Sequence, residues 1–433
     1  MRRAAEPVLQ SWLTYAFLWA LSRAYLGWEM AHRVSYIVGD VVYYYQQLDA
    51  GAGDVGRILV EYPTPVVWAM EALRQVTGRD RATFVFGFMV LMVVLDATMT
   101  RLLWVHGGSR RVAAVVAWIV FVTFIGPLAY YRFDLAPALV AGAAALYVHK
   151  KPATAGGLVA IGASLKLWPA LLVLPLLGRG PERSRSGVAF AVVGAGLALG
   201  SLVSAGWART VSPLTWQSDR GLQIESVPAT WLMWLRTFDP SAPVHVAMSR
   251  YNAYEITGQG VAASIQASTV AGMVGVAVIA WLGWRVVRLP NRSAGTVSAV
   301  MLAVILVMIV TNKTLSPQYV IWLGGPICAL IAAADADGDE IWGAPLLFTA
   351  AGWLVAIGTE QVYPTLYGEL VTGRGTPWAT SVLVLRNVGL VVLTVASVWY
   401  AAVSTSAVAA TAVAGAGKVE SVTMEPVEPG TDA

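Results

Sequence analysis

The sequence has one cysteine, four histidines and little charge, and each shortage excludes a class of protein. The single cysteine, Cys328, excludes a disulfide framework and a thiolate metal site. The histidines lack the spacing of metal ligands; they are His32, His106, His149 and His245. Charged residues make up 12% of the chain, about half the share of a soluble domain. No basic tract of the kind that binds nucleic acid is present. We therefore expect no metal, no cofactor and no nucleic-acid partner.

Long apolar runs are what the sequence has in abundance. Hydrophobic residues make up 57% of the 433 residues, and 18 residues are tryptophan, which is enriched at membrane interfaces. Runs of about 20 apolar residues are long enough to cross a bilayer. We place them near 8–28, 82–104, 112–130, 134–149, 187–206, 265–286, 295–312, 317–334, 342–360 and 378–402. The pattern predicts an all-α polytopic membrane protein.

The apolar segment 154–178 differs from the others because Lys166–Pro169 interrupts it with a charge and a helix breaker. Arg and Lys concentrate on the cytoplasmic side of membrane proteins. A single crossing would put Arg179, Arg183 and Arg185 outside, whereas two short helices meeting at Lys166–Pro169 put every positive cluster inside. We therefore predict a broken short pair whose tip lines a cavity. This brings the total to about twelve membrane helices, with both termini cytoplasmic.

The membrane domain is predicted to span 1–402. The segment 403–433 is rich in Ser, Thr and Ala and then turns acidic, which predicts a disordered cytoplasmic tail. Two stretches of the outer-face loops, 66–77 and Val227–Leu235, are expected to lie in the interface as short helices.

Two charged residues, Asp96 and Arg386, lie inside predicted spans. Isolated charges are costly at membrane depth. We therefore expect the two to pair with each other, or Arg386 to extend toward the interface. Neither is assigned to catalysis.

An aromatic and acidic stretch follows the first apolar run, so it lies just beyond one face of the membrane. Asp40 is followed by Tyr43–Tyr45, and Glu61 and Tyr62 lead into Pro63–Pro65, where two prolines end any helix. A carboxylate among aromatic side chains at the membrane rim suits a general base beside a sugar. The alternative is a polar loop with an interfacial aromatic belt.

Cations gather on the predicted outer face. Arg132 lies in a short turn, Lys166 at the tip of the broken pair, and Lys313 beside the start of a helix. Separated cations that converge on one face favour an anion, and the anion accessible there is a lipid phosphate. A pair between Arg132 and Asp134 is the alternative for that turn.

The stretch Arg220–Ser226 in the long outer loop adds a cation, an amide and a carboxylate. Such groups suit the recognition of sugar hydroxyls. The alternative is a solvated loop.

Taken in order, these motifs resemble a known family. They are Asp40 with Tyr43–Tyr45, Glu61–Pro63, Tyr131–Asp134, Leu165–Pro169, Arg220–Ser226 and Lys313–Tyr319. The arrangement resembles the actinobacterial polyprenol-phosphate-mannose-dependent α-(1→2)-mannosyltransferases, glycosyltransferase family 87 of the GT-C superfamily, over residues 8 to about 400. One departure is Pro63–Pro65, where the family pattern has Tyr-Pro-Pro.

The resemblance implies a GT-C-type bundle in the plasma membrane. It also implies inverting transfer of mannose from a polyprenyl phosphate donor to a glycolipid or lipoglycan acceptor on the outer, periplasmic face. In this family the base is an aspartate of the first outer loop, a place that Asp40 matches, with Glu225 as its rival. The residues that would bind the donor phosphate are Arg132, Lys166, Arg220 and Lys313. Those that would bind the sugar or the acceptor are Tyr44, Glu61, Tyr62, Asp134, Gln223, Glu225, Gln318 and Tyr319.

Two other interpretations stay open at this point. The same chemistry could transfer arabinofuranose or glucose instead of mannose. A carrier or flippase for lipid-linked sugars would also place basic residues near lipid, but it favours interrupted helices in both halves of the chain. The sequence shows one such interruption.

Overall fold

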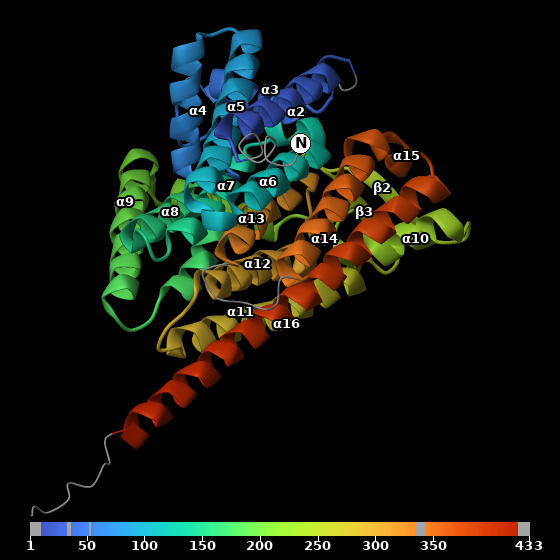
Figure 1. Ribbon diagram of the computed structural model, residues 1–433. Coiled ribbons are helices and arrows are strands. Elements are labelled where there is room, and N and C mark those ends of the chain that lie inside the picture. Colours follow the sequence, from blue (N-terminus) through green and yellow to red (C-terminus); the bar gives the residue numbers. More distant parts are fainter. Residues whose placement is uncertain (1–9, 33–35, 52, 335–342, 423–433) are drawn as a thin grey trace, which may run out of the picture.

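Helices form nearly all of the structure, a computed structural model that describes residues 10–32, 36–51, 53–334 and 343–422, with side chains up to residue 406 (Figure 1). In this part of the chain six helical segments are long and apolar enough to cross a membrane. They are Arg81–His106, Gly108–Tyr130, Pro181–Ser218, Val261–Arg288, Ala294–Thr311 and Pro377–Ser406. Three further apolar helices are shorter, at Leu135–Tyr147, Pro152–Leu165 and Pro317–Ala333. The larger total of about twelve membrane helices stays a prediction.

Each predicted apolar run contains an α-helix, although α9 and α16 extend well beyond their runs, and short helices connect the long ones. The α-helices are α2 (Trp12–His32), α3 (Gly39–Gly51), α4 (Thr64–Thr77), α5 (Arg81–His106), α6 (Arg111–Ile125), α7 (Leu135–Tyr147), α8 (Pro152–Leu165), α9 (Pro181–Ser218), α10 (Thr230–Phe238), α11 (Val261–Arg288), α12 (Ala294–Thr311), α13 (Gly324–Ala333), α14 (Gly343–Glu360), α15 (Tyr367–Val371) and α16 (Pro377–Val422). The connecting helical turns are η1 (Gly108–Arg110), η2 (Gly126–Tyr130), η3 (Trp168–Leu176), η4 (Val227–Ala229), η5 (Pro317–Leu323) and η6 (Gln361–Thr365).

The centre of the bundle consists of α7, α12 and α13, whose residues are buried almost all round. A side chain on Gly142 of α7 would lie 2.8 Å from the Cα of Gly325 on α13, so only glycine allows the two backbones to approach this closely. At the periphery, α9 exposes valines such as Val192 and Val203. An apolar outer face of this kind is what a helix in contact with lipid presents.

The predicted break at Lys166–Pro169 is confirmed. Helix α8 ends at Leu165, Lys166 adopts an extended conformation, and η3 begins at Trp168 with Pro169 in its first turn. Proline is tolerated there because the first N–H groups of a helix have no partner within it. The two short helices therefore present Lys166 at the point where they meet.

The long loop that is predicted for the outer face is more ordered than the sequence predicts. Helix α9 continues past a kink at Gly206 to Ser218. A three-stranded antiparallel sheet follows, with β1 (Leu222–Gln223), β2 (Val244–Met248) and β3 (Tyr254–Gly258) in the order β1-β3-β2. The prediction of a purely helical protein is corrected in this one place.

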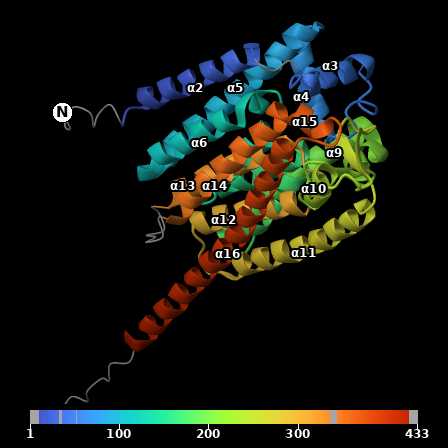
Figure 2. The same ribbon diagram turned by 90° about the vertical axis from the view of Figure 1, so that its right-hand side faces the viewer.

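Helices are confirmed in both stretches expected at the interface. Helix α4 covers 64–77, and η4 with α10 covers 227–238. Helix α10 buries Leu232 and Met233 and exposes Trp231 and Trp234 on its other face. These short elements gather with α3 and α15 at one end of the bundle (Figure 2).

At the C-terminal end, α16 extends beyond the bundle in both views (Figures 1 and 2). Its helix reaches Val422 and so includes part of the segment predicted to be a disordered tail. Residues 423–433 lie outside the described part, and the division at residue 402 stays a prediction.

The pairing expected between Asp96 and Arg386 is wrong. Asp96 accepts two hydrogen bonds from Arg23, at 2.7 and 2.9 Å, and others from Trp19, Trp118 and Tyr130. These bonds join α2, α5, α6 and η2. Arg23 and Asp96 are both buried, and each neutralises the charge of the other. A charge in a nonpolar interior is costly unless it is paired in this way.

Candidate active site

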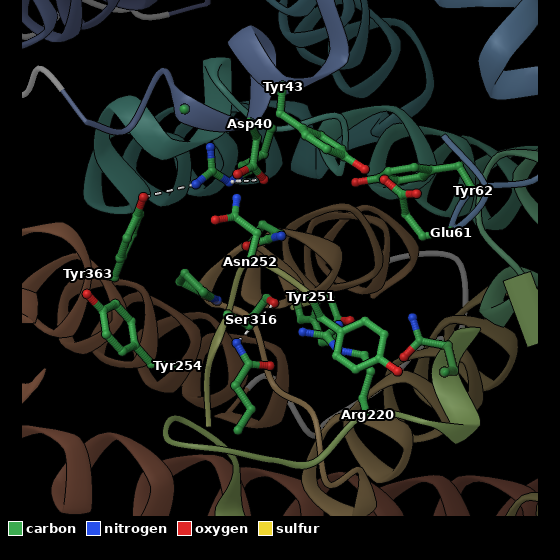
Figure 3. Close-up of a pocket in the computed structure, with 18 of the residues that line it drawn as sticks. Asp40, Tyr43, Glu61, Tyr62, Arg220, Tyr251, Asn252, Tyr254, Ser316 and Tyr363 are labelled. Carbon is green, nitrogen blue, oxygen red and sulfur yellow. Dashed lines mark hydrogen bonds and ion pairs between the residues drawn. The ribbon is translucent and has the colours of Figure 1, made fainter. Parts of the chain in front are cut away.

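A cavity of about 1020 Å³ opens among the short elements that gather at one end of the bundle (Figure 3). Its walls come from α3, the turn before α7, the tip between α8 and η3, the end of α9, the β2–β3 hairpin, η5 and η6. Segments far apart in the sequence meet here, and most of them are the motifs that the sequence singles out.

Asp40 lies in the first turn of α3, where a helix N-terminus favours a carboxylate. Its side chain is 28% exposed, and its Oδ2 lies 3.0 Å from Nε of Arg132. This contact is an ion pair, and Arg132 donates hydrogen bonds to the carbonyls of Ile37 and Tyr131 and to the hydroxyl of Tyr363. The alternative pair between Arg132 and Asp134 is therefore absent, and Arg132 instead orients Asp40.

Glu61 and three tyrosines continue this side of the cavity (Figure 3). Burial raises the pKa of Glu61 above its ordinary value of 4.5, and its contact with Tyr43 opposes the rise. The Oε2 atom of Glu61 has no hydrogen-bond partner. The hydroxyls of Tyr44 and Tyr62 lie 2.9 Å apart. This side thus offers two carboxylates and several hydroxyls to a polar ligand.

Lys166 forms an ion pair with Asp134, with 2.5 Å between Nζ and Oδ1. Trp322 donates its indole N–H to the same oxygen at 2.7 Å. The ammonium also lies 4.9 Å from the ring centroid of Tyr319, which stacks on Trp322, and Trp322 in turn stacks on Trp168. Lys166 therefore borders a largely buried stack of three aromatic rings, which lines the cavity.

Arg220 lies on the opposite side of the cavity from Asp40, and the tip of the β2–β3 hairpin extends into the view between them (Figure 3). The tip consists of Ser249–Ala253, and Asn252 adopts φ 53°, a left-handed conformation that asparagine tolerates. Gln223 also lines this side, 3.4 Å from the hydroxyl of Ser316. Sequence reasoning missed the hairpin residues. The alternation in Val244–Met248 and Tyr254–Gly258 around a polar turn was the signal that could have found them.

Tyr363 and Tyr254 form a further wall that sequence reasoning missed (Figure 3). Tyr363 lies in η6, where the backbone leaves helical geometry, and its ring packs edge-on against Tyr367. Its hydroxyl accepts a hydrogen bond from Arg132, which lies more than two hundred residues earlier in the chain. No local pattern announces such a contact.

Most of the predicted site residues line the cavity. Those that do are Asp40, Tyr44, Glu61, Tyr62, Arg132, Lys166, Arg220, Gln223, Gln318 and Tyr319. The structure does not bring Asp134, Glu225 or Lys313 to the lining. Asp134 lies behind Lys166, and Lys313 donates a hydrogen bond to the carbonyl of Ser218 at 2.9 Å.

Glu225 is fully buried, and its Oε2 lies 3.2 Å from a guanidinium nitrogen of Arg386. Burial raises the pKa of Glu225 to about 7, and Arg386 opposes the rise. Asn387 holds the same turn through the carbonyl of Glu225 and the hydroxyl of Thr230. These contacts attach the segment after β1 to α16. In this arrangement Glu225 has a structural role.

Histidine, cysteine and carboxylate side chains form no group of three or more that could hold a metal ion in the described part of the chain. The prediction that the reaction uses neither metal nor cofactor is left as a prediction.

The cavity therefore combines two chemistries. One side carries carboxylates that can accept a proton from a hydroxyl group, and the other carries guanidinium groups that can hold an anion. Aromatic rings lie between them. This combination suits a ligand with a polar ring and a phosphate.

The comparison with protein families agrees with this chemistry. The sequence model of glycosyltransferase family 87 matches residues 62–312, more than half of the chain. The match contains the Arg132 turn, the Lys166 tip, Arg220 and the hairpin, while Asp40 and Tyr363 lie outside it. No curated protein matches the chain.

Proposed function

The chain belongs to glycosyltransferase family 87, and from this premise we propose a specific reaction. The protein transfers mannose from a polyprenyl phosphate donor to a hydroxyl group of a glycolipid or lipoglycan acceptor, on the outer face of the plasma membrane. The family makes it a membrane glycosyltransferase. The donor, the acceptor, the face of the membrane and the GT-C architecture belong to the proposal.

The observation that carries the proposal is the placement of Asp40 on the wall of a large cavity, with Arg220 on the far side of that cavity. A volume of 1020 Å³ is at the upper end of the roughly 300–1,000 Å³ of single-ligand pockets. It suits a donor and an acceptor bound together. A transferase needs both substrates at once, because its acceptor takes the place of water.

Asp40 acts as the general base of a single displacement at the anomeric carbon. The acceptor hydroxyl gives its proton to a carboxylate oxygen of Asp40 as its own oxygen forms a bond to that carbon. The bond from the same carbon to the phosphate oxygen breaks, and the polyprenyl phosphate leaves with the bonding electrons. Arg132 holds Asp40 in position through the 3.0 Å contact.

The residues around Asp40 recognise the sugars. Glu61 has an unpartnered carboxylate oxygen, and Tyr43 and Tyr62 have hydroxyls at the same side of the cavity. Such groups bind sugars because the hydroxyl groups of a sugar can each donate a hydrogen bond to a carboxylate and accept one from a tyrosine. The aromatic stack beside Lys166 supports a sugar ring from its apolar face.

The test uses purified protein in lipid nanodiscs with radiolabelled polyprenyl-phosphate-mannose and a glycolipid acceptor. We expect labelled acceptor, and none with the arabinofuranosyl or glucosyl donors. Asp40→Asn keeps the size of the side chain but removes its basicity, so turnover should fall about 10²–10⁴-fold. Asp49→Asn on the same helix, exposed and outside the cavity lining, is the matched control and should keep its activity.

Well-folded Asp40→Asn protein with near-normal turnover would refute the assignment of the base. Transfer from a different donor would correct the sugar. Movement of the labelled lipid between leaflets without transfer of its sugar would favour a carrier.

A further inference from the structure

The charged side chains of the cavity wall are distributed unevenly. Asp40 and Glu61 lie on one side, and Arg132 binds directly to Asp40. Lys166 is matched by Asp134. Among the described residues that line the cavity, two cations have no carboxylate within ion-pair distance. They are Arg220 and Arg250.

These two arginines meet at one tyrosine. Arg250 donates a hydrogen bond to the hydroxyl of Tyr251 at 2.6 Å, and its guanidinium carbon lies 4.8 Å from the centroid of the ring. The guanidinium carbon of Arg220 lies 6.0 Å from the same centroid. Trp216 packs edge-on against Tyr251 and fixes the ring from the end of α9. The hairpin thus brings Arg250 to the arginine that precedes β1.

Arg220 has unused hydrogen-bonding capacity. Its Nε is buried and has no partner. The negative charges of Asp219 and Glu255 act on Arg250, although neither carboxylate forms an ion pair with it. A buried N–H without a partner costs free energy, and a ligand with acceptor oxygens restores the missing bond. Guanidinium groups suit phosphate because their N–H groups match its oxygens.

The geometry of an inverting displacement separates this pair from Arg132. The base and the leaving group must lie on opposite faces of the anomeric carbon. In inverting glycosidases, the base lies about 6.5–9.5 Å from the group that assists departure. Arg132 is 3.0 Å from Asp40, so a phosphate bound there would lie beside the base and be repelled by it. Arg220 lies on the far side of the cavity from Asp40 (Figure 3).

We propose that the phosphate of the lipid-linked donor binds between Arg220 and Arg250 at Tyr251, and that Arg132 takes no part in holding it. This inference rests on the proposed function. It turns the hairpin tip, which no sequence motif singled out, into part of the donor site. The donor's sugar then extends from this phosphate subsite toward Asp40.

The test measures binding without turnover. Undecaprenyl phosphate and undecaprenol are titrated into the purified full chain in detergent micelles. We expect Arg220→Gln and Arg250→Gln to weaken binding of the phosphate about 10- to 100-fold, the effect of losing a hydrogen bond to a charged group. Their affinity for undecaprenol should not change, and Arg250→Lys should restore part of the loss.

Arg57→Gln is the control, because this arginine is 86% exposed and pairs with Asp54 away from the cavity. Arg250 is exposed at the tip of the hairpin, so its variant tests the site even if Arg220→Gln does not fold. The same titrations are repeated with phosphatidylglycerol, a phospholipid of the membrane, at equal concentration. If the two variants lose affinity for this phospholipid instead of the polyprenyl phosphate, the site belongs to an acceptor and the proposal is overturned.

The two ways of failing are distinguishable. Unchanged affinity in both variants, while the wild type still prefers the phosphate over the alcohol, overturns the subsite and leaves the proposed donor intact. So does a loss of affinity confined to Arg132→Gln. A wild type that binds the phosphate and the alcohol equally overturns the polyprenyl phosphate donor and the subsite with it.

Discussion

Replacing Lys166 by methionine should destabilise the protein strongly, because it leaves Asp134 buried without its counter-charge. The two charges lie 2.5 Å apart, and their side chains are 18% and 1% exposed. At an effective dielectric constant of about 20, unit charges at the 2.5 Å of this pair attract by roughly 7 kcal/mol before desolvation is counted. Removing one partner of a buried pair costs about 3–5 kcal/mol of the free energy of unfolding, and we expect Lys166→Met to fall in this range.

A double-mutant cycle separates the pair from the rest of the site. Lys166→Met, Asp134→Asn and the double variant are purified in micelles and unfolded by titration with sodium dodecyl sulfate. The double variant should lose less free energy of unfolding than the two single variants lose together, because no buried charge remains unmatched. Lys151→Met, at the opposite end of α8, is exposed and should change the free energy of unfolding by less than about 0.5 kcal/mol.

Additive losses in the cycle would refute the reasoning, since they would mean that Lys166 and Asp134 do not interact. A Lys166→Met variant as stable as the wild type would refute it as well. A confirmed coupling assigns Lys166 first to the fold of the broken pair. Any contact of Lys166 with the donor phosphate would then appear separately: the double variant would bind the donor more weakly than Asp134→Asn alone.

Two further predictions concern the rival base and the topology. Glu225 keeps its proton in the folded protein over a range in which the unfolded chain has lost it, since burial raises its pKa from 4.5 to about 7. The free energy of unfolding should therefore fall by roughly 3 kcal/mol as the pH rises from 4.5 to 7. Glu225→Gln should remove that fall while turnover stays near that of the wild type, and a large loss of turnover would restore Glu225 as the base. In a Cys328→Ser background, an impermeant thiol reagent added to intact cells should label a cysteine placed at Ser218 and spare one at Ser184. The two positions lie at opposite ends of α9, and labelling of position 184 would invert the predicted orientation.

The helices and the motifs of the site could be predicted from the sequence because both are local. Runs of apolar residues are read directly along the chain, and they place α5, α11 and α12 within a few residues. The charge and the proline at Lys166–Pro169 disfavour a continuous helix at that point, and this effect is local to the sequence. Asp40 and Glu61 follow from their place after the first apolar run, and both line the cavity.

The partners of the charges were decided only by the tertiary structure. Arg132 lies two residues from Asp134 in sequence, but it binds Asp40, while Asp134 binds Lys166. An ion pair forms where both groups are buried together, and nearness along the chain does not determine burial.

The hairpin is the second feature that only the fold could place. Nothing near Arg220 in the sequence announces that Arg250 will lie against the same tyrosine, since antiparallel pairing of β2 with β3 brings it there. Sequence alone determined which chemical groups the connecting segments hold. Packing decided which of them are neutralised by one another, and therefore which remain free to bind a substrate.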